Sequence, residues 1–277
     1  MAETGFVSEY ELKESEYRQL RDIVYDHAGI HLGDNKKELV HARLTKILRK
    51  RGIPDFRQYI QMLDADSSDD ELIMLLDAIS TNVTHFFREQ EHFNFLSEIL
   101  PDFQKNKPIR VWSAGCSSGE EPYSLAITLK EYHEKTGGPE PAIIATDLST
   151  KVLKKAVGAV YPMKAVNRLE QSLLRKYFLK GKGSAENFVK VKKDVTRLVT
   201  FERMNLMEPV RFSQEFDVIF CRNVMIYFDG ITRTNVVRKY HEALNTGGYL
   251  FIGHSESLNG IEHDFSYVRP TIYRKTR

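Results

Sequence analysis

Two glycines and two glutamates stand where a strand should pass into a helix. Gly115 and Gly119 follow the apolar run Ile109–Ser113, and Glu120 and Glu121 begin the next helical pattern. A glycine-rich turn of this kind is typical of folds that bind nucleotide-like cofactors, although several cofactors share it. Two carboxylates at the positive end of a helix dipole would repel a pyrophosphate. They favour a phosphate-free ligand with a cationic centre, such as S-adenosyl-L-methionine; the alternative is that they only compensate the helix dipole.

Polar side chains also follow three other apolar runs that read as strands: Asp147 after Ala142–Thr146, Arg222 and Asn223 after Phe216–Cys221, and His254 after Tyr249–Gly253. In a parallel sheet the carboxyl ends of the strands lie along one edge, where ligands bind. An acidic side chain in the place of Asp147 accepts hydrogen bonds from ribose hydroxyls. We therefore expect one ligand site along this edge.

Two further patterns could do chemistry but lack a necessary part. His27 and His31 have the spacing of a metal pair on a helix, but Gly29 interrupts it and no third ligand is evident. The sequence Gly253-His254-Ser255-Glu256-Ser257 resembles a nucleophile elbow, but a serine replaces its final glycine. We therefore expect neither a metal site nor a serine hydrolase.

The elements that must position these residues divide the chain in two. Residues from about 9 to 77 carry helical periodicity, whereas beyond Pro108 short apolar runs alternate with helical segments. We expect an α/β fold, with a Rossmann-like, mostly parallel sheet, preceded by an all-helical amino-terminal domain. The length of 277 residues agrees with two domains of ordinary size.

The expected boundaries are 1–80 for the helical domain, 81–107 for a linker that contributes to the active site, and 108–277 for the α/β domain. Residues from about 161 to 199 exceed what one strand-helix unit requires. Within them, Gly181-Lys182-Gly183-Ser184 precedes the alternating run Phe188–Lys192, which predicts a small inserted β-subdomain. Its exposed edge could take up a peptide strand, or the insertion could be decoration alone.

One helix of the first domain is strongly basic. From 36 to 51, an apolar stripe of Val40, Leu44, Ile47 and Leu48 lies opposite a basic face of Lys36, Arg43, Lys46 and Lys50. This face is either a docking surface for an acidic partner or a solvated surface. The net charge of +2 argues against a protein that coats nucleic acid.

Nothing in the sequence indicates secretion or membrane insertion. The first residues, Met1–Gly5, do not begin a signal peptide, and no apolar run is long enough to span a bilayer. Cys116 and Cys221 form no metal-like pair and suit reduced intracellular thiols. We expect a cytoplasmic protein.

Four segments together resemble the CheR-type chemotaxis receptor glutamate methyltransferases: Thr81-Asn82-Val83-Thr84-x-Phe86-Phe87-Arg88, the run from Trp112 to Ser124, the run from Phe220 to Phe228, and Gly253-His254-Ser255-Glu256. The resemblance extends from the helical domain to near the carboxyl terminus. It implies a class I methyltransferase domain that uses S-adenosyl-L-methionine and releases S-adenosyl-L-homocysteine. The acceptor it implies is the γ-carboxylate of glutamates on membrane chemoreceptors, to whose clusters the protein would be recruited during adaptation.

The resemblance also implies site residues. The matching cofactor-binding positions are Asn82, Thr84, Arg88, Gly115, Glu121, Asp147, Asn205, Leu206, Asn223 and Val224. Arg88 and Tyr227 are the expected catalytic positions, as groups that orient the reactants. The basic face would meet the receptor's helical bundle, and the β-subdomain would bind a receptor carboxyl-terminal peptide in those relatives that tether one.

The implied chemistry agrees with the lack of a catalytic triad. A glutamate carboxylate, with an ordinary pKa of about 4.3, is already an anion at neutral pH and needs no general base. The sequence leaves two alternative hypotheses. One is a non-catalytic adaptor that keeps the cofactor fold, and the other is a nicotinamide-dependent oxidoreductase, which the acidic helix start disfavours.

Overall fold

The computed structural model describes residues 10–104 and 106–277, so the segment Met1–Gly5 lies outside the described residues. The chain forms two compact units that divide between Thr81 and Asn82. Within the described residues, no helix combines the length and the apolar character that crossing a membrane requires.

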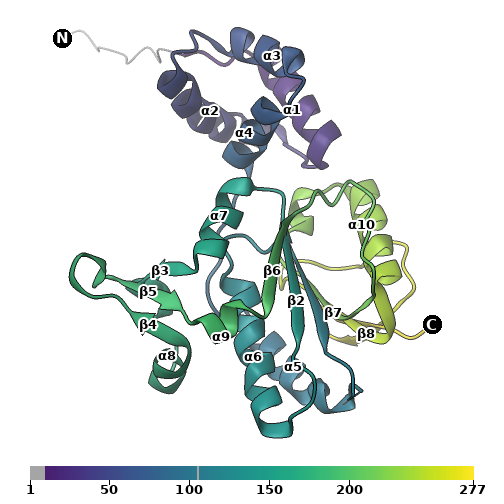
Figure 1. The fold of residues 1–277 in the computed structure, drawn as a ribbon. Helices are drawn as coiled ribbons and strands as arrows, with labels where there is room; N and C mark the ends of the chain where they lie inside the picture. The colour runs from purple at the N-terminus through teal and green to yellow at the C-terminus, as the bar shows by residue number, and fades with distance from the viewer. Residues whose placement is uncertain (1–9, 105) are drawn as a thin grey trace, which may run out of the picture. The chain divides into compact units, whose positions relative to one another are not determined.

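The first unit is built from the helices α1 (Glu14–Ala28), α2 (Lys37–Arg51), α3 (Phe56–Ala65) and α4 (Asp70–Ile79) (Figure 1). α1 ends at Gly29, whose φ of 65° is left-handed, so His31 lies outside the helix that carries His27. α2 ends at Gly52 in the same way. The basic helix therefore forms within one residue of its expected start, and its apolar stripe is buried at Val40, Leu44 and Leu48.

Arg43 does not belong to an open basic surface. Its guanidinium donates to the backbone carbonyls of Ala78, Ile79 and Ser80 and to the Thr81 hydroxyl. The last carbonyls of a helix have no partner inside it, and Arg43 satisfies those at the end of α4. Lys36, Lys46 and Lys50 remain exposed, so the expected basic face is reduced to these three lysines.

The second unit contains a seven-stranded sheet in the order β6-β2-β1-β7-β8-β10-β9. The strands are β1 (Arg110–Ala114), β2 (Ala142–Asp147), β6 (Val199–Arg203), β7 (Phe216–Cys221), β8 (Leu244–Ile252), β9 (Phe265–Arg269) and β10 (Ile272–Lys275). Among these strands, β10 alone runs against the common direction and is antiparallel to both β8 and β9. The order reverses between β1 and β7, which is where ligands bind in such sheets. The expected mostly parallel, Rossmann-like sheet is confirmed.

Helices cover both faces of this sheet. In strand β1, successive side chains point to opposite faces of the sheet, and each face contacts a different helix. The Trp112 ring packs against Tyr240 of α10 (Gly230–Ala243), whereas the hydroxyl of neighbouring Ser113 bonds to α6 (Glu120–Thr136). Helix α7 (Thr150–Gly158) follows β2 (Figure 1).

The inserted β-subdomain is a three-stranded antiparallel sheet in the order β3-β5-β4. Its elements are β3 (Val160–Pro162), α8 (Gln171–Tyr177), β4 (Phe178–Lys180) and β5 (Phe188–Val191), and the short α9 (Lys193–Thr196) returns the chain to β6. Gly181 opens the turn between β4 and β5, where a Cβ would lie 1.9 Å from the Ala185 carbonyl oxygen. Glycine is therefore required there.

The segment between the helical unit and β1 is part of the second unit. It contains α5 (Gln90–Ile99), whose Phe93 and Leu96 are buried in the same core as β1 and α6. Phe86 packs edge-on against Tyr161 and Phe178 of the β-subdomain. This segment therefore fastens the α/β core and the insertion to each other, which a plain linker would not do.

Candidate cofactor-binding and active site

The glycine-rich turn after β1 has a backbone that only glycine adopts readily. Gly115 and Gly119 have φ values of 81° and 93°. A Cβ on Gly115 would lie 2.3 Å from a methyl group of Val224, and one on Gly119 would lie 2.8 Å from the Tyr161 hydroxyl. The turn is therefore packed between the loop after β7 and the β-subdomain.

Both carboxylates that follow this turn are engaged within the protein. Glu121 accepts from the Ser113 hydroxyl at 2.7 Å and from the Arg222 guanidinium at 2.8 Å. Glu120 accepts from the Ser118 hydroxyl at 2.6 Å. The Glu121 charge is thus already paired with a cation that follows β7, 101 residues away in the sequence.

Arg222 is the most enclosed cation near the site, with a side chain only 2% exposed. It also donates to the Arg88 carbonyl oxygen, and its guanidinium lies over the rings of Phe93 and Phe220 at 5.3 and 5.4 Å. A buried charge is tolerated only when it is paired and hydrogen-bonded. Arg222 meets both conditions and ties the segment before α5 to α6.

Asp147 lies at the carboxyl end of β2 and holds the neighbouring loops. Its two oxygens accept from the backbone N–H groups of Ser117 and Ser149, at 2.8 and 2.9 Å. A carboxylate can accept about four hydrogen bonds, so these contacts are compatible with the predicted bonds from ribose hydroxyls.

Asn223 has a strained backbone and an unsatisfied side chain. Its φ is 61°, and its N–H donates to Glu256, which also accepts from the N–H of Gly253. The Asn223 side-chain oxygen is buried, and no partner for it exists among the described residues. An orphaned buried acceptor is costly, and the amino group of S-adenosyl-L-methionine is a donor of the kind that would satisfy it. The residues present therefore fit that cofactor.

The segment from Asn82 to Arg88 lies against the glycine-rich turn. The Ser117 hydroxyl donates to the Asn82 carbonyl at 3.0 Å, and buried Phe86 anchors the segment. Thr84 is partly exposed beside it. The Arg88 guanidinium donates to the Val83 carbonyl at 3.0 Å, and its side chain is 29% exposed.

The remaining predicted positions lie in the loops after β6 and β7. The Asn205 side-chain oxygen accepts from the Met207 N–H at 3.0 Å, and Leu206 follows it in the same turn. Tyr227 ends a short 3-10 helix, and its N–H donates to the Val224 carbonyl. Apart from this short 3-10 helix, both loops are irregular. Helical periodicity in the sequence therefore could not predict their conformation.

A histidine cluster adjoins the site but does not resemble a metal centre. Potential ligand atoms of Glu89, His92 and His254 lie within 4.8 Å of one another. However, the Arg222 guanidinium lies 3.5 Å from Glu89 and 3.3 Å from His92, and this charge opposes a second cation. Burial, then Arg222, lowers the pKa of His92 to about 3, so this ring is neutral at pH 7.

Three residues around the site were not singled out from the sequence. Glu89 accepts from the His254 N–H and stands next to Arg88, a neighbourhood that could have revealed it. Glu256, which accepts from the N–H groups of Asn223 and Gly253, lies in one of the resembling segments without a predicted role. Lys239, on the surface of α10, bonds to the loop after β6, and no pattern in the sequence distinguishes it from other surface lysines.

Comparison with known proteins agrees with this geometry. The family model "CheR methyltransferase, SAM binding domain" matches residues 82–274, and "CheR methyltransferase, all-alpha domain" matches residues 15–80. The chain is 42% identical over 273 residues to a chemotaxis protein methyltransferase of Borreliella burgdorferi, covering 95% of each chain. It is 38% identical to that of Salmonella typhimurium, over 95% of this chain and 90% of the relative. The corresponding Escherichia coli protein is 36% identical, over 95% and 91%.

These matches cover both units and nearly the whole length of the relatives. S-Adenosyl-L-methionine is therefore the cofactor, and the nicotinamide-dependent and non-catalytic readings are set aside. The chain belongs to the CheR methyltransferase family and is an enzyme that transfers a methyl group from S-adenosyl-L-methionine.

Proposed function

We propose that the enzyme methylates the γ-carboxylate of glutamates on chemotaxis receptors. The observation that carries the proposal is that most N–H donors of Arg88 make no hydrogen bond within the described residues. Its guanidinium has five N–H donors; within the described residues its one hydrogen bond is to the Val83 carbonyl, and its Nε lies 4.0 Å from the Glu89 carboxylate. The remaining donors suit a carboxylate held beside the site without a permanent ion pair.

The site needs no general base for this reaction. When bound, the cofactor supplies a sulfonium methyl group: a carboxylate oxygen forms the new C–O bond as the S–CH3 bond breaks, leaving a neutral thioether. Rate enhancement then depends on positioning and on exclusion of water. We assign the positioning of the carboxylate to Arg88, and we propose that the Tyr227 ring borders the same place.

The cofactor would be held by the positions that line the carboxyl edge of the sheet. Asp147 suits the ribose hydroxyls, the Asn223 oxygen and Glu121 suit the amino end, and Gly115 with Val224 shapes the floor. Asn82, Thr84, Asn205 and Leu206 are proposed to complete the site.

The decisive test is transfer of radiolabelled methyl groups from S-adenosyl-L-methionine to receptor-containing membranes. Labelled receptor that releases methanol in base would support glutamate esters, whereas base-stable label or no label would contradict them. Arg88→Ala should lower kcat/KM by about tenfold or more, because a charge-assisted hydrogen bond is lost. Arg88→Lys keeps the charge and should retain more activity; unchanged transfer in Arg88→Ala would refute the role given to Arg88.

The lysines of α2 are proposed to meet the acidic surface of the receptor's helical bundle. Lys36, Lys46 and Lys50 are exposed, and exposed charges steer association in a salt-dependent way. Lys46→Glu should raise KM for receptor and weaken its dependence on salt. Arg57→Glu, an exposed position on α3, is the matched control. Equal effects of the two changes would argue against this face.

The β-subdomain is proposed to bind a receptor tail by adding a strand to its sheet. β4 is an edge strand with half-exposed Leu179, and an unpaired strand edge accepts an extended peptide. Receptors with and without their carboxyl-terminal tail should bind with different Kd values; equal values would contradict tethering. The same contacts would recruit a cytoplasmic enzyme to membrane receptor clusters.

A further inference from the structure

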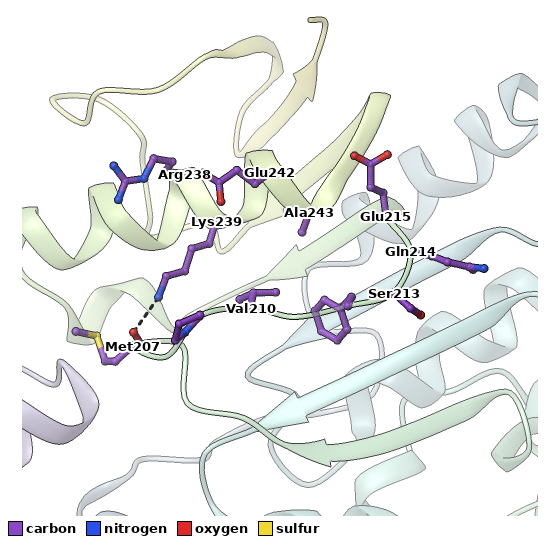
Figure 2. A pocket seen from close by; sticks show the side chains of 11 residues that line it. Met207, Val210, Ser213, Gln214, Glu215, Arg238, Lys239, Glu242 and Ala243 are labelled. Carbon is purple, nitrogen blue, oxygen red and sulfur yellow. Dashed lines mark hydrogen bonds between the residues drawn. The ribbon is translucent and has the colours of Figure 1, made fainter.

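Lys239 makes an unusual set of contacts for a lysine on a surface helix. Its ammonium group donates to three consecutive backbone carbonyls, those of Leu206, Met207 and Glu208, at 2.7, 2.9 and 2.8 Å. An ammonium has three N–H donors, so all of them are used. Figure 2 shows this side chain reaching from α10 to Met207.

The segment that Lys239 holds begins the connection between β6 and β7. Residues 204–215 make this connection without a regular helix. Its far end is fixed by packing, since the Phe212 ring packs edge-on against the Trp112 ring of β1, with ring centroids 5.0 Å apart. Near α10, however, a cavity of about 610 Å³ separates parts of the segment from the helix. This cavity is lined from Met207 to Glu215 on the side of the segment, so the three hydrogen bonds of Lys239 are the polar link between its beginning and α10.

The same turn is tied to the predicted cofactor residues. Asn205 accepts from the N–H groups of Met207 and Glu208, with its side chain and its backbone carbonyl respectively. Met204 donates its N–H to the Asp147 carbonyl at 3.1 Å. The three carbonyls that Lys239 gathers thus belong to a turn whose first residues stand beside the expected ribose position.

We propose that Lys239 is a positioning residue for the cofactor, which fixes the 205–208 turn so that Asn205 and Leu206 can contact the adenosine end. This rests on the proposed placement of Asn205 and Leu206 in the cofactor site. Burial lowers the pKa of Lys239 below its usual value, which agrees with a cation directed into the protein instead of into solvent.

Neighbouring Arg238 offers a matched control. It lies one residue away on α10, is exposed, and bonds only locally to the Asn235 side chain within the described residues. Lys239→Met keeps the length of the aliphatic stem and removes the donors. Arg238→Met changes the charge of the helix equally but leaves the turn untouched.

Calorimetric titration of the full chain with S-adenosyl-L-homocysteine tests the proposal. Lys239→Met should raise Kd by about tenfold, since charge-assisted hydrogen bonds are lost, and should raise KM for S-adenosyl-L-methionine while kcat changes less than about twofold. Arg238→Met should match the wild type. A Kd within about twofold of wild type in Lys239→Met, or an equal rise in Arg238→Met, would overturn the proposal.

Two further variants keep the outcomes separable. If Lys239→Met does not fold, Lys239→Gln decides, because its amide offers only two N–H donors on a shorter side chain; an unchanged Kd there would equally overturn the proposal. If Asn205→Ala leaves Kd unchanged, the placement of Asn205 fails and the role of Lys239 fails with it. If Asn205→Ala weakens binding but Lys239→Met does not, only the role of Lys239 fails.

Discussion

Arg222 and Glu121 join the loop after β7 to the first turn of α6, and both side chains are almost completely buried. Removing one member of a buried ion pair leaves the other charged and without compensation. Arg222→Met should therefore lower the free energy of unfolding by about 3–5 kcal/mol, measured by urea denaturation. Arg222→Lys retains the charge and should lose less. A loss below about 1 kcal/mol in Arg222→Met would mean that the pair contributes no more than a surface pair.

His92 makes the stability of the folded protein depend on pH. Because its pKa is about 3 in the folded protein and about 6.5 when unfolded, the unfolded chain binds the extra proton between these values. Stability contributed by neutral His92 is therefore present above pH 6.5 and is lost progressively as the pH falls toward 3.

His92→Gln removes this titration. The slope of unfolding free energy against pH, measured between pH 6 and 4, should fall relative to wild type by up to about 1.4 kcal/mol per pH unit. The group that most strongly opposes protonation, besides burial, is Arg222, followed by His254; nearby Glu89 acts in the opposite sense. Identical slopes in the two proteins would show that His92 keeps an ordinary pKa.

At the scale of elements, Arg43 stabilises the end of α4 from another helix. Arg43→Met should lower the free energy of unfolding by about 1–3 kcal/mol, because the carbonyls at the helix end lose their donors. Lys46→Met, an exposed change on the same helix, should have little effect. Comparison of the two denaturation curves checks this; equal curves would show that solvent replaces Arg43 without cost.

The elements themselves were largely predictable, for a physical reason. Parallel strands buried on both faces, such as β7, are continuous apolar runs bounded by polar residues, and the sequence displays them. β6 was missed because it is an edge strand with exposed Glu202 and Arg203. The side-chain partners of Arg43 and Glu121 could not be foreseen, since no local pattern encodes a contact between residues far apart in the chain.

At the scale of the whole molecule, all the proposed cofactor residues belong to the second unit. A fragment of residues 82–277 should therefore fold, since each unit has its own core. It should bind S-adenosyl-L-homocysteine with a Kd within about threefold of the full chain, as measured by calorimetry. Weakening by a hundredfold or more would show that the helical unit contributes to the pocket.

The place of β10 constrains the order of events during synthesis. β9 is made first, yet it pairs with the sheet only through β10, which lies between β8 and β9. Until Ile272–Lys275 has left the ribosome, Phe265–Arg269 has no strand to join and the edge of β8 is uncovered. A chain truncated before residue 270 should thus stay open to limited proteolysis within 254–269, whereas the same stretch of the full chain should be protected.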